Sequence, residues 1–308
     1  MTDKRSVFQK GILSIFLSLV LVLGVSLSAC SDNPIPRGEL NNPIKIGVVK
    51  SSDPQWKILQ DGLLEQGLTV QIVNFSDYTS ENSALSRQEL DMNQFQHLDY
   101  LASYNYETGD DLVPIGATAV FPIGLYPNKL ASVHALNDIK EGDTIVIPND
   151  DTNQSRAIHL LVSAGLVEVN DSSQSILTPN NILETSKVKV KSVQANQAAH
   201  SLSDKSVSAA VINNDYIKDA NLAPKDAILE EKADDEFAQR FINVWVVKKL
   251  YVNDSLVNKV VNWANNSQAF LNAIKENSAG TAQIVAKDYN AEKLQSILAK
   301  LQDEKTKE

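Results

Sequence analysis

Arg156 is the side chain of this sequence best placed to bind an anion. It lies in the segment from Thr144 to Leu161, TIVIPNDDTNQSRAIHLL, where an apolar run leads through a polar loop into an expected helix. In doubly wound sheets such strand ends face the ligand crevice, and a helix N-terminus favours negative charge. A cation there is disfavoured unless an anion shares the site, so Arg156 is a candidate bidentate receptor for a carboxylate. The structural alternative is a salt bridge to Asp150 or Asp151.

Asp215 stands at the end of a second apolar run. The segment from Ser208 to Tyr216, SAAVINNDY, passes from small and β-branched residues to polar ones, with a helix expected beyond it. A carboxylate at this place could accept hydrogen bonds from a ligand ammonium. A helix cap is the alternative, and this segment taken alone favours the cap.

Aromatic side chains gather around His97. The stretch from Asp91 to Leu101, DMNQFQHLDYL, holds Phe95, His97 and Tyr100, and the last two would lie one turn apart on a helix. Two aromatic rings and an imidazole could form a wall for an apolar ligand side chain. Core packing is the more common role of aromatic residues at this spacing.

Patterns of catalytic or metal-binding chemistry are missing from the sequence. Its four histidines are widely spaced, at positions 97, 134, 159 and 200. We find no H-E-x-x-H, no G-x-S-x-G elbow, no P-loop and no G-x-G-x-x-G. Carboxylates are plentiful, but no pair is singled out as a general acid and base. We therefore expect no catalytic residue, no metal site and no cofactor.

Cys30 is the only cysteine and closes the tetrapeptide LSAC, which reads as a lipobox. Lys4, Arg5 and Lys10 precede an apolar stretch over 11–29 that glycines and serines interrupt, as in an export signal. The Cys30 thiol would carry diacylglycerol and its freed amine a further acyl chain, an anchor that gains about 0.8 kcal/mol per buried methylene. An uncleaved signal anchor is the alternative, because roughly 18 apolar residues can span a bilayer.

Composition and charge limit the classes of protein to which this chain can belong. The 308 residues are 43% hydrophobic and carry a formal net charge of −10 at pH 7. An acidic surface argues against nucleic-acid binding. Because Cys30 is unique, the exported domain can form no internal disulfide and must rely on core burial. We expect a signal peptide at 1–29, the lipidated cysteine and a tether at 30–42, and a domain held outside the cytoplasm on the cell membrane by lipid.

From residue 43 onwards, short β-rich runs alternate with longer helical ones. This alternation predicts an α/β fold with parallel sheets covered on both faces. Strands are expected at 44–49, 68–73, 112–115, 120–126, 144–147, 188–193, 209–212, 227–229 and 243–247. Helices are expected at 55–66, 82–87, 94–108, 153–164, 196–202, 214–220, 254–265, 268–278 and 292–302, and Thr152 or Asn153 is the expected N-cap of the fourth.

Two changes of pattern suggest a division into lobes. A polar stretch at 127–143 precedes a fresh strand-loop-helix unit, and a second change falls near 234–240. We therefore predict one lobe from 43–127 and 240–308 and a second from 128–239. Two chain crossings between them would form a hinge.

Several long motifs in the same order resemble those of the NlpA-type methionine-binding lipoproteins, the substrate-binding subunits of methionine ABC importers. DMNQFQHLDYL resembles the family's DANYFQHxPYL, and IPNDDTNQSRAIHLL resembles IPNDPTNxxRALxLL. Further matches are FSDY with NSAL, PIGLY, AGL and NLAPKDA. The likeness spans nearly the whole chain after the signal peptide.

The resemblance implies a fold and a function. The fold is the two-lobed, type II architecture of periplasmic binding proteins, which closes on its ligand by a hinge motion. The function is capture of an amino acid, methionine by likeness, for delivery to a membrane permease driven by an ATPase. A different amino acid, a short peptide, an extracytoplasmic enzyme on the same scaffold and a surface adhesin are the alternatives.

The resemblance also implies a ligand site. The family's arginine for the ligand carboxylate falls on Arg156, with Asn153 beside it. The family's aromatic pocket for the thioether falls on four residues, Tyr78, Phe95, His97 and Tyr100. Asparagines near the ligand's polar end fall on Asp215 and Asn243.

The chain departs from the family pattern at three positions, one of them in this site. The family's N-x-N-Y becomes NNDY, so Asp215 stands where an asparagine is expected. An ammonium would tolerate that carboxylate, whereas a nearby ligand carboxylate would not, because an uncompensated buried charge is costly. Phe241 replaces a tyrosine, and Asp151 replaces a proline.

Overall fold

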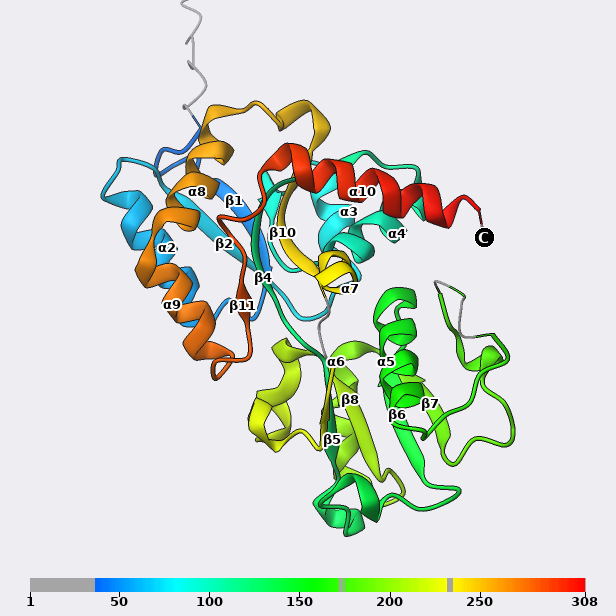
Figure 1. Cartoon of the computed structure of the whole chain (residues 1–308). Coiled ribbons are helices and arrows are strands. Elements are labelled where there is room, and N and C mark those ends of the chain that lie inside the picture. Colours follow the sequence, from blue (N-terminus) through cyan, green and yellow to red (C-terminus); the bar gives the residue numbers. More distant parts are fainter. Residues whose placement is uncertain (1–36, 172–173, 175, 232–234, 308) are drawn as a thin grey trace, which may run out of the picture. The chain divides into compact units, whose positions relative to one another are not determined.

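Figure 1 shows the chain as a computed structural model, which describes residues 37–171, 174, 176–231 and 235–307. The predicted signal peptide, the lipidation site at Cys30 and the first half of the tether lie outside the described residues. Within the described part of the chain, no helix has the length and apolar character needed to cross a membrane.

The first of two sheets has six strands, in the order β11-β4-β10-β3-β1-β2. These strands are β1 (Ile44–Val49), β2 (Val70–Phe75), β3 (Met92–Asn93), β4 (Leu112–Val120), β10 (Ile242–Lys248) and β11 (Gln283–Ile284). Its helices are α2 (Pro54–Leu64), α3 (Glu81–Ser86), α4 (Leu98–Thr108), α8 (Ser255–Asn266), α9 (Gln268–Asn277) and α10 (Ala291–Lys305).

The second sheet has five strands, in the order β7-β6-β8-β5-β9. These are β5 (Gly124–Pro127), β6 (Thr144–Pro148), β7 (Lys189–Val193), β8 (Ala209–Ile212) and β9 (Leu229–Glu230). Its longest helix is α5 (Asp151–Ser163), and the shorter ones are α6 (Ala195–Ala198), η1 (Lys129–Ala131), η2 (Leu136–Asp138), η3 (Pro179–Asn181), η4 (His200–Ser203), η5 (Asn214–Ala220) and η6 (Pro224–Asp226). Helix α7 (Asp235–Arg240) precedes β10, and η7 (Lys249–Tyr251) follows it.

Both sheets are mixed, so the prediction of parallel sheets was wrong. Strand β1 runs parallel to β2 and β3, but β10 is antiparallel to β3 and β4, and β5 is antiparallel to β8 and β9. The chain passes directly from β4 into β5 of the other sheet and returns as β10. A strand that arrives from another sheet needs no crossover helix of a βαβ unit, and it can therefore pair in the antiparallel direction.

Most helices and strands lie where the sequence pattern predicted them, and the exceptions are short or capped elements. The strand expected at 120–126 divides into the end of β4 and the separate β5, and the helix expected at 94–108 begins only at Leu98. Strands β3 and β11 and helix α7 were not predicted, and the segment 214–220 is a 3₁₀ helix. Two-residue strands are too short to show a two-residue period in the sequence. Whether they form depends on pairing with neighbouring strands.

Buried hydrophobic residues pack on both faces of the first sheet. Along β10, Trp245 packs in a cluster with α2, α8 and α9, whereas its neighbours Val244 and Val246 pack with α3, α4 and α10. This alternation follows the two-residue period of a strand. Trp245 is 0% exposed, and its ring lies 6.2 Å from the rings of Trp56 and Phe270.

The second sheet is also covered on both faces. Helix α5 packs Ala157, Ile158 and Leu161 against alternate residues of β6 and β8. The opposite face packs on α6 and η5 and also receives Tyr78 and Phe95, which belong to segments of the first sheet. The strands of the first sheet come from 44–120 and 242–284 and those of the second from 124–230. The exact lobe boundaries remain predictions.

Candidate functional site

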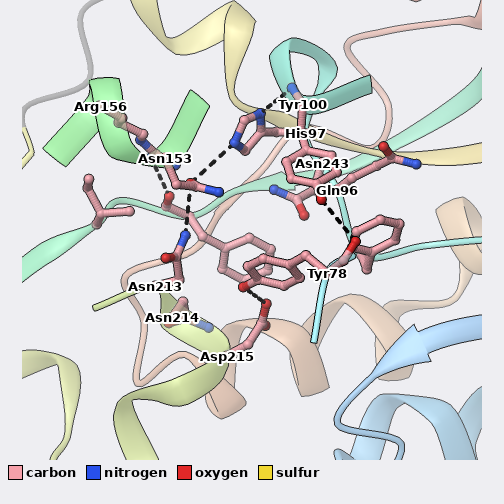
Figure 2. Close-up of a pocket in the computed structure, with 13 residues that line it drawn as sticks. Tyr78, Gln96, His97, Tyr100, Asn153, Arg156, Asn213, Asn214, Asp215 and Asn243 are labelled. Atoms are coloured by element: carbon pink, nitrogen blue, oxygen red, sulfur yellow. Dashed lines mark hydrogen bonds between the residues drawn. The ribbon is translucent and has the colours of Figure 1, made fainter. Parts of the chain in front are cut away.

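One pocket brings together the ends of strands from both sheets (Figure 2). Its empty space, including the part open to solvent, is about 410 Å³. All eight residues that the sequence nominated for ligand binding line it: Tyr78, Phe95, His97, Tyr100, Asn153, Arg156, Asp215 and Asn243. Five further residues complete the lining: Gln96, Phe121, Ile123, Asn213 and Asn214. Their roles toward a ligand remain predictions.

The N-terminus of α5 sets the position of Asn153. Strand β6 ends at Pro148, and the N-cap is Asp150, whose Oδ1 accepts from the backbone N–H of Asn153 at 3.0 Å and from its Nδ2 at 2.9 Å. The expected cap at Thr152 or Asn153 was therefore wrong, because the carboxylate two or three residues earlier reaches the free N–H groups. The Asn153 Oδ1 in turn accepts from Asn213 Nδ2 at 2.9 Å.

Arg156 is buried in the pocket wall and paired with Glu231. Its Nε donates to Glu231 Oε1 at 2.7 Å, its Nη2 donates to the second carboxylate oxygen, and Nη2 also donates to the Phe121 carbonyl at 2.7 Å. The guanidinium carbon lies 4.0 Å from the centre of the Phe241 ring. The expected alternative, a salt bridge to Asp150 or Asp151, was wrong.

Glu231, the partner of Arg156, was not nominated from the sequence. It follows β9 and lies 75 positions beyond Arg156, in a segment without any motif. Only the folded chain brings the two side chains together. A buried arginine needs a counter-ion, and this requirement is the one signal that could have prompted a search for an acidic partner.

His97 faces the pocket as a neutral imidazole. It is the N-cap of α4, and its Nδ1 accepts from the Tyr100 backbone N–H at 3.1 Å. This bond places the ring hydrogen on Nε2, which lies 3.4 Å from Asn153 Oδ1. Burial, helped by the charge of Arg156, lowers the pKa of His97 to about 3. His97 therefore adds a hydrogen-bond donor to the pocket but no charge.

Three aromatic rings form one wall of the pocket. The centre of the Tyr78 ring lies 5.8 Å from that of Phe95 and 6.2 Å from that of Tyr100, and those of Phe95 and Tyr100 lie 5.7 Å apart. The Tyr100 hydroxyl donates to the Tyr78 carbonyl at 2.9 Å and closes the group. These aromatic residues therefore pack against one another and also line the pocket. The core-packing role and the pocket-wall role considered for them belong to the same side chains.

Asp215 lies beside this wall. It belongs to η5, whose N-cap is Asn213, so the expected role of Asp215 as a helix cap was wrong. One of its oxygens accepts from the Tyr78 hydroxyl at 2.6 Å. Burial raises the pKa of Asp215 to about 6, although the Tyr78 bond opposes the shift. The carboxylate is therefore ionised at neutral pH but protonates in mild acid.

A network of amides supports the floor of the pocket. Asn82 Nδ2 donates to Gln96 Oε1 at 2.7 Å, and Asn93 Nδ2 donates to Asn82 Oδ1 at 2.9 Å. The network holds Gln96 against the pocket. Asn243 is placed by a backbone bridge to His97, and its carbonyl accepts from the Thr118 hydroxyl at 3.2 Å. Because these bonds come from α3, β3, β4 and β10, the tertiary structure determines the positions of Gln96 and Asn243.

The arrangement suits capture of a small zwitterion. A guanidinium, a carboxylate and an apolar wall meet in one pocket with several amide groups. Across the described residues, no three histidine, cysteine, aspartate or glutamate side chains are arranged to hold a metal ion.

Known proteins are similar to this chain in sequence and in fold. The model of the family described as NlpA lipoprotein matches residues 44–287. The D-methionine-binding lipoprotein MetQ of Escherichia coli is 32% identical over 243 residues, which cover 72% of this chain and 86% of the relative.

Two solved structures extend the comparison. The substrate binding protein of a methionine transporter from Streptococcus pneumoniae has a TM-score of 0.72 at 34% identity and covers 79% of this chain and 95% of its own. A nutrient binding protein from Burkholderia cenocepacia, solved bound to methionine, has a TM-score of 0.70 at 33% identity and covers 78% and 99%. The predicted α/β fold of the type II periplasmic binding proteins is thereby confirmed, and the chain belongs to the NlpA lipoprotein family.

Proposed function

We propose that this chain is a lipid-anchored substrate-binding protein that captures methionine outside the cytoplasm and delivers it to an ABC importer. The observation that carries the proposal is the single pocket in which Arg156, Asp215 and the aromatic wall meet. These are the three groups that a free amino acid with an apolar side chain requires. The methionine named for the relatives from E. coli, S. pneumoniae and B. cenocepacia supports the choice of ligand.

Each part of methionine has a partner in the pocket. The ligand carboxylate contacts Arg156, and its ammonium contacts Asp215 and Asn243. The thioether packs on the aromatic wall, where a sulfur contact adds about 0.3–1.5 kcal/mol beyond burial. No covalent step is required, because the task is reversible capture.

Delivery of the ligand requires partner proteins in the membrane. A membrane permease and its ATPase would receive the loaded protein. The S. pneumoniae relative is the substrate binding protein of a methionine transporter, which supports such a delivery. Closure on the ligand by a hinge at the two chain crossings would distinguish the loaded form from the empty one.

Native mass spectrometry of the freshly purified protein tests the ligand directly. We expect a bound mass equal to one methionine, and calorimetry with L- and D-methionine should then rank the two stereoisomers. Norleucine serves as the control, because it replaces the sulfur with a methylene and should bind up to about tenfold more weakly. A different bound mass, with no heat from either methionine, would show that the ligand is another amino acid or a peptide.

The anchor makes a separate prediction. Cys30→Ala removes the only thiol and should prevent lipidation, so the chain should shift from the membrane fraction to the soluble fraction of the host cell. Fractionation and incorporation of labelled palmitate measure the change, with Ser31→Ala as the control. If the Cys30→Ala chain stays in the membrane fraction, the segment before it is an uncleaved signal anchor.

A further inference from the structure

Most of the hydrogen-bonding capacity of Arg156 is already used by the protein. A guanidinium has five N–H donors. The described contacts occupy three of them: the Nε donor and one Nη2 donor on Glu231, and the other Nη2 donor on the Phe121 carbonyl. None of these contacts uses the two donors on Nη1. A ligand carboxylate would therefore have to share the guanidinium with Glu231.

The charges of Arg156 and Glu231 cancel inside the site. Their side chains are only 3% and 10% exposed, so solvent screens the pair weakly. Two anions around one guanidinium repel each other, and this repulsion weakens the hold of Arg156 on a ligand carboxylate. The salt bridge to Glu231 therefore fixes the position of Arg156 and weakens its attraction for a ligand carboxylate.

Among the described residues, no arginine or lysine pairs with Asp215 as Arg156 pairs with Glu231. Its described hydrogen bond comes from the uncharged Tyr78 hydroxyl. Lys50, whose charge acts to lower the pKa of Asp215, bonds both carboxylate oxygens of Asp219, each at 2.7 Å. Since His97 is neutral, the described pocket residues together with Glu231 carry a surplus of negative charge, located at Asp215.

We propose that Glu231 is a specificity-determining residue: by neutralising Arg156 it makes a free ammonium on the ligand indispensable and a free carboxylate dispensable. The inference rests on the proposed function and narrows its substrate class to α-amino compounds, including those whose carboxyl group is blocked as an amide. Ligands with a free carboxylate and a blocked amine are excluded. Specificity then comes from an unfavourable charge balance as well as from attraction.

Two derivatives of methionine test the proposal by calorimetry at pH 7.5. Methioninamide keeps the ammonium and lacks the carboxylate, whereas N-acetylmethionine keeps the carboxylate and lacks the ammonium. For the unmodified protein we expect methioninamide to bind within about tenfold of methionine and N-acetylmethionine to bind at least a hundredfold more weakly, since each factor of ten corresponds to about 1.4 kcal/mol. The reverse order would overturn the proposal without any mutation.

Glu231→Gln then separates charge from structure. The amide keeps the size of the side chain but removes its charge, so N-acetylmethionine should gain at least tenfold in affinity relative to methioninamide. A purely structural role would weaken all three ligands alike and would refute the inference. Glu230→Gln is the matched control, because this exposed neighbour makes the same change in net charge and does not line the pocket.

The outcomes separate this inference from the proposed function. If native mass spectrometry identifies another amino acid, its amide and its N-acetyl derivative replace those of methionine, and the same order of affinities is expected. If Glu231→Gln does not fold, as judged by circular dichroism, the order of affinities in the unmodified protein decides the question alone. If no amino acid binds at all, the proposed function fails and the inference fails with it.

Discussion

Arg156→Ala is expected to weaken methionine binding by about 2–5 kcal/mol, which is thirtyfold or more, because the ligand carboxylate would then lie beside the Glu231 carboxylate with no guanidinium between them. The same change leaves the Glu231 carboxylate buried and unpaired. Loss of one partner from a buried ion pair costs about 3–5 kcal/mol of folding stability. A weaker calorimetric signal from Arg156→Ala would therefore combine the effect of the lost ligand contact with the effect of partial unfolding.

A paired substitution resolves this ambiguity. Arg156→Met combined with Glu231→Gln removes both charges together, and such replacements of buried pairs are often neutral for stability. We expect its melting temperature to stay close to that of the unmodified protein while methionine binding is still largely lost. Arg87→Ala is the control, because Arg87 pairs with Glu89 on the surface. Normal affinity in the folded double variant would remove Arg156 from the binding site.

Methionine affinity is expected to fall as the pH drops below about 6, because protonated Asp215 offers no charge to the ligand ammonium. Burial raises the Asp215 pKa to about 6. Below that value, affinity should decrease by up to about tenfold per pH unit. Titration calorimetry between pH 5 and pH 8 measures the slope. In Asp215→Asn the slope should disappear in this range, and a slope that persists would assign the titration to another group.

The groups around Asp215 shift its pKa in both directions. Burial and the charges of Asp53 and Asp219 act to raise its pKa, whereas the Tyr78 hydrogen bond and the charge of Lys50 act to lower it. The buried carboxyl of Glu81 also has a raised pKa, caused mainly by burial and then by Asp215, so it favours the neutral form. His97 does not contribute near neutrality, since its pKa lies at about 3.

The stability of the ligand-free protein should change with pH in the opposite direction to its affinity. A carboxyl group whose folded pKa is raised stabilises the fold below its unfolded pKa of about 3.9, and this contribution is lost as the pH rises through its folded pKa. For Asp215 the loss falls between about pH 4 and pH 6. Asp215→Asn should therefore be more stable than the unmodified protein at pH 8, by about 1–3 kcal/mol. The Asp215 carboxylate should therefore cost stability at neutral pH, which a role in ligand binding would explain.

The sequence by itself predicted the features that short segments determine. Alternating runs of β-branched and amphipathic residues predicted most strands and helices, because the periods of 2.0 and 3.6 residues are properties of the local chain. Polar residues at the ends of β6 and β8 nominated Arg156 and Asp215, since such strand ends face ligand sites in this class of fold. The ordered motifs around His97 and Arg156 identified the family.

The tertiary structure alone decided how these pieces meet. The antiparallel strands β5 and β10 depend on the two passages of the chain between the sheets, and β3 exists only because β1 and β10 flank it. The partner of Arg156 is Glu231 rather than the nearby Asp150 or Asp151. A buried charge pairs with whatever opposite charge the fold brings into reach, and distance along the chain does not enter that choice. For this reason the charge balance of the pocket, on which its specificity depends, was outside the reach of local sequence patterns.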